Sequence, residues 1–380
     1  MKYFISAGEA SGDLHASHLI KALRDADAEA SFAFLGGDLM REAAGCDPVI
    51  HYRHMAYMGF SEVLRHLRQI LGNFRRARQA LEQSHPDALI LVDYPSFNLR
   101  LAKAARRMGI PVYYYISPKV WAWKEHRVSD IRRLVERVYC ILPFEVDFYR
   151  SRHDMDVTYV GNPSREEVDA RLASLPAKGD FMLRHGLVAE KPLVALVPGS
   201  RRGEIRNNLP VMLAAAARFD GCQMAVAVAP GVERSFYEEY AAAGVVFVEG
   251  DTLALMAMAD AALVTSGTAT LECALAGTPQ VVCYRANGSR LSYAVMSRIL
   301  KVDYVSLPNL IAGRGIIPEM LLHRCNPDAV ARELGRILPG GEGRAAQLAG
   351  YDEMRRRLGV SDAAAVTAAS IVASLRAYKS

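Results

Sequence analysis

Short apolar runs alternate with amphipathic stretches along the first 160 residues of the chain. The runs have the length and the β-branched or aromatic content of buried strands, and the stretches between them, such as Leu14–Arg24, carry apolar residues at helical spacing. Strands that alternate with helices predict a parallel sheet covered by helices. The predicted strands are Tyr3–Ala7, Phe32–Leu35, Ala88–Val92, Val112–Ile116 and Arg137–Ile141, with one more near Val157–Val160.

The same pattern starts again after a polar, helical linker. Its strands are expected at Leu193–Val197, Met224–Val228, Val245–Val248, Ala261–Val264 and Gln280–Tyr284. The sequence therefore predicts an α/β protein with two Rossmann-like domains that face a cleft, the first covering residues 1–163 and the second residues 164–345. The Ala-rich segment 346–380 is expected to be helical and to pack back on the first domain.

The bulk composition restricts the functional classes. Of the 380 residues, 51% are hydrophobic and 23% are charged, which indicates a folded chain with large cores. The net charge of +5 suits an anionic substrate or membrane, but it lacks the concentrated basic footprint of a nucleic-acid binder. The 6 cysteines form no C-x-x-C pair and the 10 histidines are scattered, so we predict reduced thiols, a cytoplasmic location and no catalytic metal.

Small hydroxyl residues and a glycine follow the strand that ends at Val264. Ser266, Gly267 and Thr268 open a predicted helix, whose first N–H groups have no internal partners and attract anions. Glu272 lies about one turn further along, where a carboxylate can accept hydrogen bonds from a ribose diol. The alternative is an ordinary helix N-cap.

A second glycine and hydroxyl loop follows the strand that ends at Val197. It contains Ser200 and Arg201, and the guanidinium suits a bidentate phosphate contact. The G-x-x-x-x-G-K spacing of a Walker loop is absent, and a solvated basic turn is the alternative. Two such loops in one domain favour a diphosphate ligand.

Asp93 stands at the carboxyl end of the apolar strand Ala88–Val92, before a proline turn. A carboxylate at this edge of a parallel sheet can take a proton from an attacking hydroxyl, although a turn or helix cap explains it equally well. The loop predicted at Gly8–Asp13 follows the neighbouring strand and does not satisfy G-x-G-x-x-G, which argues against a nicotinamide cofactor.

The segment 55–81 combines an apolar helical face with arginines. Its arginines include Arg65, Arg68, Arg75 and Arg76, and no acid stands between Glu62 and Glu82. A basic amphipathic helix is typical of contact with anionic lipid, and a helix packed on the sheet is the alternative. No run reaches the ~18 uncharged apolar residues of a membrane span, so we expect peripheral contact only.

Several longer motifs resemble one family. They are Ser6-Ala-Gly-Glu-Ala-Ser-Gly-Asp13, Met58-Gly-Phe-Ser-Glu-Val63, Asp93-Tyr-Pro-Ser-Phe-Asn98, Ile116-Ser-Pro-Lys-Val-Trp-Ala-Trp123, Leu142-Pro-Phe-Glu145, Val197-Pro-Gly-Ser-Arg201, Ser266-Gly-Thr-Ala-Thr-Leu-Glu272 and Asp303-Tyr-Val-Ser-Leu-Pro-Asn-Leu-Ile-Ala-Gly-Arg314. Over nearly its whole length the chain resembles the lipid-A-disaccharide synthases, inverting GT-B-type glycosyltransferases of Gram-negative bacteria. Ser96 departs from the acidic residue expected after the proline in the Asp93 motif.

The resemblance implies a reaction and its partners. UDP-2,3-diacylglucosamine would donate its sugar to the 6-hydroxyl of 2,3-diacylglucosamine 1-phosphate (lipid X), giving a β-1,6-linked disaccharide 1-phosphate and UDP, with no cofactor. The enzyme would work at the cytoplasmic face of the inner membrane, as a possible homodimer.

The resemblance also implies roles for the residues in the motifs. Asp93 would be the general base, and the hydroxyl and glycine loops with Arg201 would hold the diphosphate. Glu272 would bind the ribose, Asn309 would face the cleft, and Glu9 and Ser11 would orient a sugar.

Besides another GT-B transferase that acts on a lipid-linked sugar, two rival functions remain open from the sequence. A UDP-N-acetylglucosamine 2-epimerase shares the two-domain plan and needs no lipid acceptor. A UDP-binding membrane scaffold would have no turnover at all, so loss of turnover on replacing Asp93 separates it from an enzyme.

Overall fold

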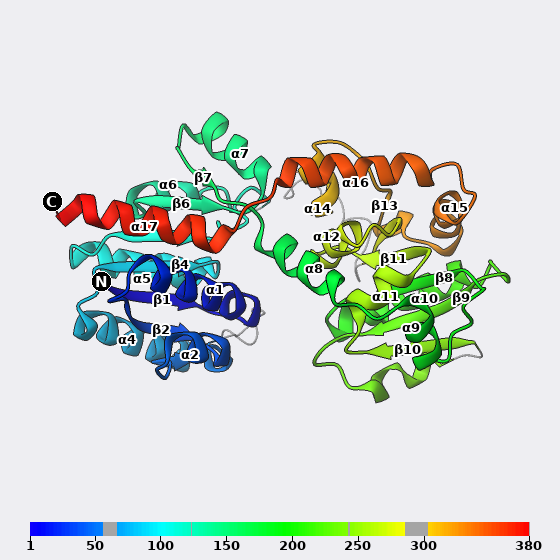
Figure 1. Ribbon diagram of the computed structural model, residues 1–380, viewed down its shortest axis with the longest axis horizontal. Coiled ribbons are helices and arrows are strands. Elements are labelled where there is room, and N and C mark those ends of the chain that lie inside the picture. The colour runs from blue at the N-terminus through cyan, green and yellow to red at the C-terminus, as the bar shows by residue number, and fades with distance from the viewer. Residues whose placement is uncertain (56–66, 123, 242–243, 286–302, 380) are drawn as a thin grey trace. The chain divides into compact units, whose positions relative to one another are not determined.

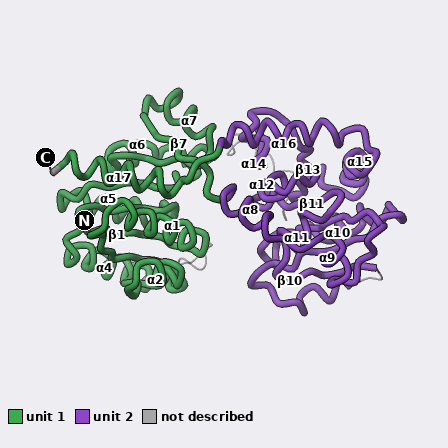
Figure 2. Tube along the Cα trace, viewed as in Figure 1, with its two compact units in different colours: residues 1–163, 360–380 green, residues 164–359 purple. Residues whose placement is uncertain are grey.

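The computed structural model describes residues 1–55, 67–122, 124–241, 244–285 and 303–379 (Figure 1). The chain divides into two compact units, which Figure 2 shows in different colours. One comprises Met1–Pro163 and Val360–Ser380, and the other comprises Ser164–Gly359. The prediction of two α/β domains is confirmed in fold class, and the second unit begins at Ser164, in the linker that precedes the first strand of the second sheet.

A parallel sheet of 7 strands, in the order β3-β2-β1-β4-β5-β6-β7, forms the centre of the first unit. Its strands are β1 (Lys2–Ala7), β2 (Ser31–Gly36), β3 (Ile50–His51), β4 (Ala88–Val92), β5 (Val112–Tyr115), β6 (Arg137–Cys140) and β7 (Thr158–Tyr159). The helices are α1 (Ala10–Ala26), α2 (Asp38–Ala44), α4 (Leu67–Ser84), α5 (Pro95–Arg107), α6 (Arg127–Leu134), α7 (Pro143–His153) and α17 (Ala363–Lys379), with a 3-10 turn η1 (Tyr52–His54).

Both faces of this sheet are buried. Phe4 belongs to one apolar cluster, whereas its neighbours Tyr3 and Ile5 belong to another, because successive strand side chains point to opposite faces. Helices must therefore cover both faces, and the apolar strands read as continuous hydrophobic runs.

The second unit repeats this plan with a parallel sheet of 6 strands in the order β10-β9-β8-β11-β12-β13. Its strands are β8 (Leu193–Val197), β9 (Gln223–Val228), β10 (Val245–Glu249), β11 (Ala261–Thr265), β12 (Gln280–Tyr284) and β13 (Glu319–Leu321). The helices are α8 (Pro163–Ala173), α9 (Lys178–Arg184), α10 (Arg202–Ala216), α11 (Thr252–Met258), α12 (Thr268–Leu275), α14 (Leu307–Ala312), α15 (Pro327–Ile337) and α16 (Arg344–Leu358), with 3-10 turns η2 (Arg234–Tyr240) and η3 (Leu322–Arg324).

The C-terminal segment differs from the prediction that residues 346–380 pack on the first unit. Helix α16 belongs to the second unit, where the Gln347 side chain bonds the backbone of Gln280 at 2.7 and 2.9 Å. Only α17 joins the first unit, where Ser370 and Ser374 accept hydrogen bonds from two tyrosines of the sheet. The helical pattern is interrupted at Gly359, so the two helices pack separately.

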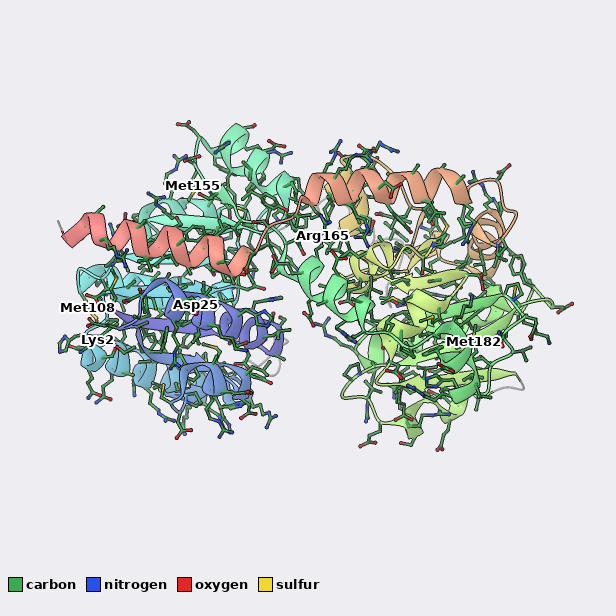
Figure 3. The ribbon with its side chains drawn as sticks, in the orientation of Figure 1. Lys2, Asp25, Met108, Met155, Arg165 and Met182 are labelled. Carbon is green, nitrogen blue, oxygen red and sulfur yellow. The ribbon has the colours of Figure 1, made fainter. Side chains whose placement is uncertain are left out.

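Helix α8 is tied to the end of α16 within the second unit. The Arg165 guanidinium, labelled in Figure 3, donates to the carbonyl of Arg355 at 2.9 Å and to that of Gly359. The carbonyl of Arg355 also accepts from the amide of Gly359 at 3.2 Å, so the guanidinium adds to the hydrogen bonds that end this helix.

One stretch, Arg344–Tyr378, is long and apolar enough to cross a membrane by length and composition, with 44% of its apolar window buried. It spans α16 and α17, which belong to different units. In α17 the buried residues include Ala368, Ile371 and Leu375, which join the core of the first unit. An apolar face of this kind on α17 is also typical of a helix packed in a folded domain.

The predicted basic helix is described only in part, because residues 56–66 and hence Arg65 lie outside the described residues. In α4, Ala77 and Leu81 are buried, whereas Arg68, Arg75, Arg76 and Arg78 are exposed. The described part of the helix thus packs on the sheet and also presents arginines to solvent. It has features of a helix packed in the domain and of a helix that contacts anionic lipid.

The loops that follow β1 and β4 are in close contact. A Cβ atom at Gly8 would lie 2.3 Å from the Tyr94 ring, so only glycine fits beneath this ring. A Cβ atom at Gly72, in α4, would meet no other atom within 4 Å.

We expect Gly8→Ala to lower the free energy of unfolding by about 1–3 kcal/mol, the range for overpacking a tight site. Gly72→Ala should instead raise it by up to about 1 kcal/mol, because alanine favours a helix. Urea unfolding of the two variants checks both signs. Equal stability of Gly8→Ala and the wild type would contradict the contact.

Candidate active site

The carboxyl ends of β1 and β4 bring the first group of predicted residues together. These strands pair in parallel with Ala7 opposite Val92, so Glu9 and Asp93 follow neighbouring strands at one edge of the sheet. The Ser11 hydroxyl donates to Glu9 Oε1 at 3.1 Å. Ligands of open parallel sheets bind at this edge, so Glu9, Ser11 and Asp93 form a candidate site in the first unit.

Asp93 has a strained backbone that two buried side chains hold in place. Asp93 and Tyr94 have φ angles of 43° and 46°, in the left-handed region that non-glycine residues seldom adopt. The carbonyl of Asp93 accepts hydrogen bonds from Asn98 Nδ2 and from the Tyr114 hydroxyl, both at 2.7 Å. Strain held by such contacts is common where a side chain must be aimed for function.

The carboxyl group of Asp93 has a raised pKa. Burial, and next the negative charge of Glu9, raise this pKa to about 6, while Lys119 lowers it. At neutral pH the group is therefore mostly ionised, yet it binds a proton more strongly than an exposed aspartate. These are the properties of a general base that works near neutral pH.

Asp13 is a structural residue, which corrects the loop predicted at Gly8–Asp13. Helix α1 begins at Ala10, so the loop consists of Gly8 and Glu9 alone. The Asp13 carboxylate is buried and accepts from the amides of Gly37, Leu39 and Met40 at 2.6–3.2 Å. It caps the first turn of α2, where unpaired amides attract a carboxylate.

The loops after β5 and β6 continue this edge of the sheet. Trp121 is half-buried and its indole donates to Glu145 at 3.1 Å, and Glu145 also accepts from the amide of Leu142 at 3.1 Å. Burial raises the pKa of Glu145 to about 8. The motifs contained both residues, but their spacing in the sequence gave no sign that they touch.

A second group of predicted residues follows β8 and β11, which pair with Val197 opposite Val264. Gly267 precedes α12 with a φ of 154°, and no side chain caps this helix. Gly267 and Thr268 are exposed, whereas the Ser266 hydroxyl donates to the carbonyl of Val305 at 3.2 Å. The exposed start of α12 thus has the character of an anion site.

The loop after β8 carries its own anion. The Glu204 carboxylate accepts from the amides of Ser200 at 2.9 Å and of Arg201 at 3.3 Å, and from the Arg201 guanidinium at 3.1 Å. The Arg201 guanidinium is the donor predicted to bind phosphate, so a phosphate at this loop must compete with Glu204 for it. Because the Arg201 side chain is 65% exposed, its ion pair with Glu204 is one of the weak surface pairs, and breaking that pair costs little.

Asn208, which the sequence analysis missed, joins these loops. Its side chain is buried, donates to the carbonyl of Pro198 at 3.3 Å and to Thr265 Oγ1 at 3.0 Å, and accepts from the amide of Arg285 at 2.7 Å. It therefore connects the loops after three neighbouring strands. An asparagine on the apolar face of a helix was the only sequence signal.

Glu272 lies one turn into α12 and is half-buried. Burial, followed by the charge of Glu167 on α8, raises its pKa, while Arg171 lowers it. Its position is compatible with the predicted ribose contact.

Asn309 is incorrectly predicted as a residue facing a cleft. Its side chain is 1% exposed, and its Oδ1 accepts from the amides of Ile316 and Ile317 at 2.7 and 2.9 Å. Its Nδ2 donates to the carbonyl of Ile317 at 3.0 Å and to Glu319 at 2.9 Å. All four hydrogen-bonding positions are used within the protein, so Asn309 is structural.

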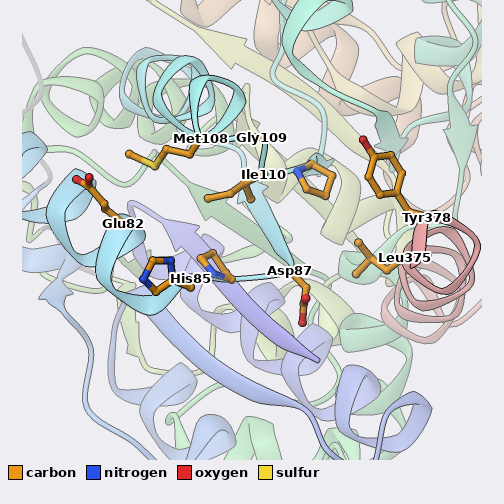
Figure 4. A pocket seen from close by; sticks show the side chains of 10 residues that line it. Glu82, His85, Asp87, Met108, Gly109, Ile110, Leu375 and Tyr378 are labelled. Carbon is orange, nitrogen blue, oxygen red and sulfur yellow. The ribbon is translucent and has the colours of Figure 1, made fainter. Parts of the chain in front are cut away.

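A cavity of about 490 Å³ lies at the opposite, amino end of the first sheet (Figure 4). His85, Asp87, Ile110 and Tyr378 are among its lining residues, and none of the predicted site residues is. Since ligands of such sheets bind at the carboxyl ends, we do not assign the active site to this cavity. Within the described ranges, no group of three metal-ligating side chains is found.

Comparisons with known proteins identify the family. A profile of the family described as lipid-A-disaccharide synthetase matches residues 3–369. The lipid-A-disaccharide synthase of Myxococcus xanthus is 42% identical over 378 residues, which are 98% of this chain and 97% of that protein. That of Solibacter usitatus is 37% identical over 361 residues, 94% of this chain and 93% of that protein.

Solved structures confirm the fold class. The UDP-GlcNAc 2-epimerase from Neisseria meningitidis, bound to UDP-GlcNAc, gives a TM-score of 0.68 at 13% identity, covering 98% of this chain and 100% of that one. MurG of Acinetobacter baumannii gives a TM-score of 0.56 at 13% identity, covering 98% of this chain and 99% of that one. Identities this low show the fold alone, so the epimerase alternative gains no support.

The resemblance stated from the motifs is confirmed across the chain. The profile match and the two relatives together show that this chain belongs to the lipid-A-disaccharide synthetase family, a family of glycosyltransferases.

Proposed function

We propose that this protein transfers 2,3-diacylglucosamine from its UDP derivative to the 6-hydroxyl of 2,3-diacylglucosamine 1-phosphate. The products are a β-1,6-linked disaccharide 1-phosphate and UDP. The observation that carries this proposal is the family match over residues 3–369. The raised pKa of Asp93 and the exposed start of α12 supply the chemistry that such a transfer needs.

Asp93 is the general base in this proposal. It removes the proton of the acceptor hydroxyl as the oxygen attacks the anomeric carbon of the donor. Attack opposite the departing UDP inverts the anomeric configuration, which accounts for a β linkage. Glu9 and Ser11 orient the acceptor sugar, and the charge of Glu9 contributes to the proton affinity of Asp93.

The second unit binds the donor. The amides at the start of α12, with Ser266, Gly267 and Thr268, hold the diphosphate, and Glu272 accepts from the ribose hydroxyls. Arg201 leaves Glu204 and pairs with a phosphate, while Ser200 contributes its hydroxyl. Preorganised donors and a cation stabilise the charge on departing UDP, so the transfer needs neither a metal nor a cofactor.

The lipid substrates place the reaction at the cytoplasmic face of the inner membrane. We propose peripheral contact through the segment 55–81, because the described arginines of α4 are exposed and can meet anionic headgroups. A second copy of the chain is the protein partner that the family resemblance implies.

Asp93→Asn should lower kcat by ~10² or more, because the amide cannot accept the proton. UDP release with donor plus acceptor measures this, and donor alone should release little UDP in the wild type. Asp130→Asn, which removes a half-buried aspartate of α6 that pairs with Lys103 and Arg133, should keep full activity. The wild-type kcat should fall as the pH decreases through about 6, where Asp93 becomes protonated.

Stability gives an independent check on Asp93. A raised pKa means that ionisation of the carboxyl group destabilises the folded protein. This penalty is complete above about pH 6 and absent below about pH 4, under the ordinary aspartate pKa. Asp93→Asn should therefore unfold at a higher temperature than the wild type at pH 8 but not at pH 4. If the variant and the wild type have the same melting temperature at pH 8 as well as at pH 4, or if the variant is fully active, Asp93 is removed from the proposal.

Arg201→Gln should raise KM for the UDP-sugar and weaken inhibition by UDP, each about tenfold or more, because a charged hydrogen bond to phosphate is lost. The adjacent Arg202→Gln is the matched control, since Arg202 instead pairs with Glu233. Steady-state kinetics with varied donor measure the effect. Identical effects of the two substitutions would contradict a specific phosphate contact.

Exchange of both Arg75 and Arg76 for glutamine should weaken binding to vesicles that contain anionic lipid, because each lysine or arginine near such a surface contributes about 1 kcal/mol. Sedimentation with anionic and with neutral vesicles measures this. Arg332→Gln with Arg336→Gln removes two charges from α15 and serves as the control. Unchanged binding of the α4 variant to anionic vesicles would refute contact through this helix.

A further inference from the structure

Lys119 is the exposed residue of an otherwise buried loop. It follows β5 in the sequence Ser117-Pro118-Lys119-Val120, in which Ser117 and Val120 are 3% and 2% exposed. The loop therefore buries its neighbours and directs the lysine side chain outward from the carboxyl edge of the first sheet.

Contacts on both sides fix the position of this loop. Ser117 Oγ lies 2.8 Å from the Tyr149 hydroxyl, and both groups are buried. On the other side, Trp121 donates to the buried Glu145, and the amide of Ala122 donates to the carbonyl of Lys119 at 3.2 Å. The backbone that carries Lys119 is thus held by the loops and helices around it, which limits where its ammonium group can lie.

The strand order places Lys119 at the same edge of the sheet as the proposed base. Strand β5 pairs with β4, with Tyr115 opposite Val92, and neighbouring strands lie about 4.8 Å apart. The positive charge of Lys119 lowers the pKa values of both Asp93 and Glu145, which agrees with a position between them. Within the described residues, Lys119 has no ion pair.

The charges at this edge pose a problem for an anionic acceptor. Glu9 and Asp93 are both carboxylates, and they would repel a phosphate group brought to the base. Among the residues that the structure describes, the loops at this edge carry the cations Arg127 and Lys119. The Arg127 guanidinium donates to Ser96 Oγ at 3.0 Å, so it is partly committed, whereas the ammonium group of Lys119 is available.

We propose that Lys119 binds the anomeric phosphate of the acceptor sugar and so makes the enzyme selective for a phosphorylated acceptor. This rests on the proposed function. The ammonium group offsets the repulsion by the two carboxylates and forms charge-assisted hydrogen bonds to the phosphate oxygens. Lys119 thus binds the phosphate of the acceptor, whereas Asp93 removes the proton of its 6-hydroxyl.

The test compares two acceptors, 2,3-diacylglucosamine with and without its 1-phosphate, in wild-type protein and in Lys119→Gln. We expect Lys119→Gln to raise KM for the phosphorylated acceptor about tenfold or more and to leave KM for the unphosphorylated one within about twofold. Lys119→Arg should restore most of the selectivity. Lys21→Gln, which removes an exposed lysine of α1, should change neither value.

The pH profile separates phosphate binding from an action through Asp93 alone. Loss of the lysine charge raises the pKa of Asp93 further, so the acidic limb of kcat moves to higher pH with either acceptor. If this shift occurs but KM changes equally for both acceptors, Lys119 only tunes the base and the proposal is overturned. Equal KM values of wild-type protein and Lys119→Gln for the phosphorylated acceptor overturn it as well.

A soluble probe gives a second measurement without lipid. Glucosamine 1-phosphate should inhibit the wild type more strongly than glucosamine, and Lys119→Gln should lose this difference. Wild-type protein that transfers sugar to neither acceptor would instead refute the proposed function, and the inference with it. A fully active wild type whose selectivity survives Lys119→Gln refutes the inference alone.

Discussion

In each unit, one buried asparagine holds together the loops that carry the candidate site. Asn98 accepts from the Ser6 hydroxyl and donates to the carbonyl of Asp93, which joins the ends of β1 and β4. Asn208 does the same for the loops after β8, β11 and β12. A parallel sheet brings loops to one edge but leaves their backbone groups unpaired, and a buried amide with two donors and two acceptor sites satisfies several at once.

The carboxyl group of Asp93 depends on this arrangement. Its left-handed backbone is costly for a residue with a side chain, and the bonds from Asn98 and Tyr114 offset the cost. The same geometry keeps the carboxylate half-buried beside Glu9, which raises its pKa. Positioning and proton affinity therefore have a common origin, while the positive charge of Lys119 lowers the pKa of Asp93 against these effects.

The fold was largely predictable, and the site was predictable only in part. Strands β4, β8 and β12 have the predicted bounds because apolar runs end sharply at polar or turn residues. The edge strands Ile50–His51 and Glu319–Leu321 are too short for such a pattern. The sequence placed Asp93 at a strand end, but it could not show that Glu204 occupies the loop amides or that Asn309 is buried, because these depend on contacts between distant segments.

The central claim is that the fold holds Asp93 as an ionised carboxylate with raised proton affinity at the end of β4. Carbon-13 NMR of aspartate side chains, with the Asp93 signal assigned by its loss in Asp93→Asn, measures this directly in the wild-type protein. The account predicts that the signal titrates with a pKa near 6. Titration near 4, as for an exposed aspartate, would contradict it.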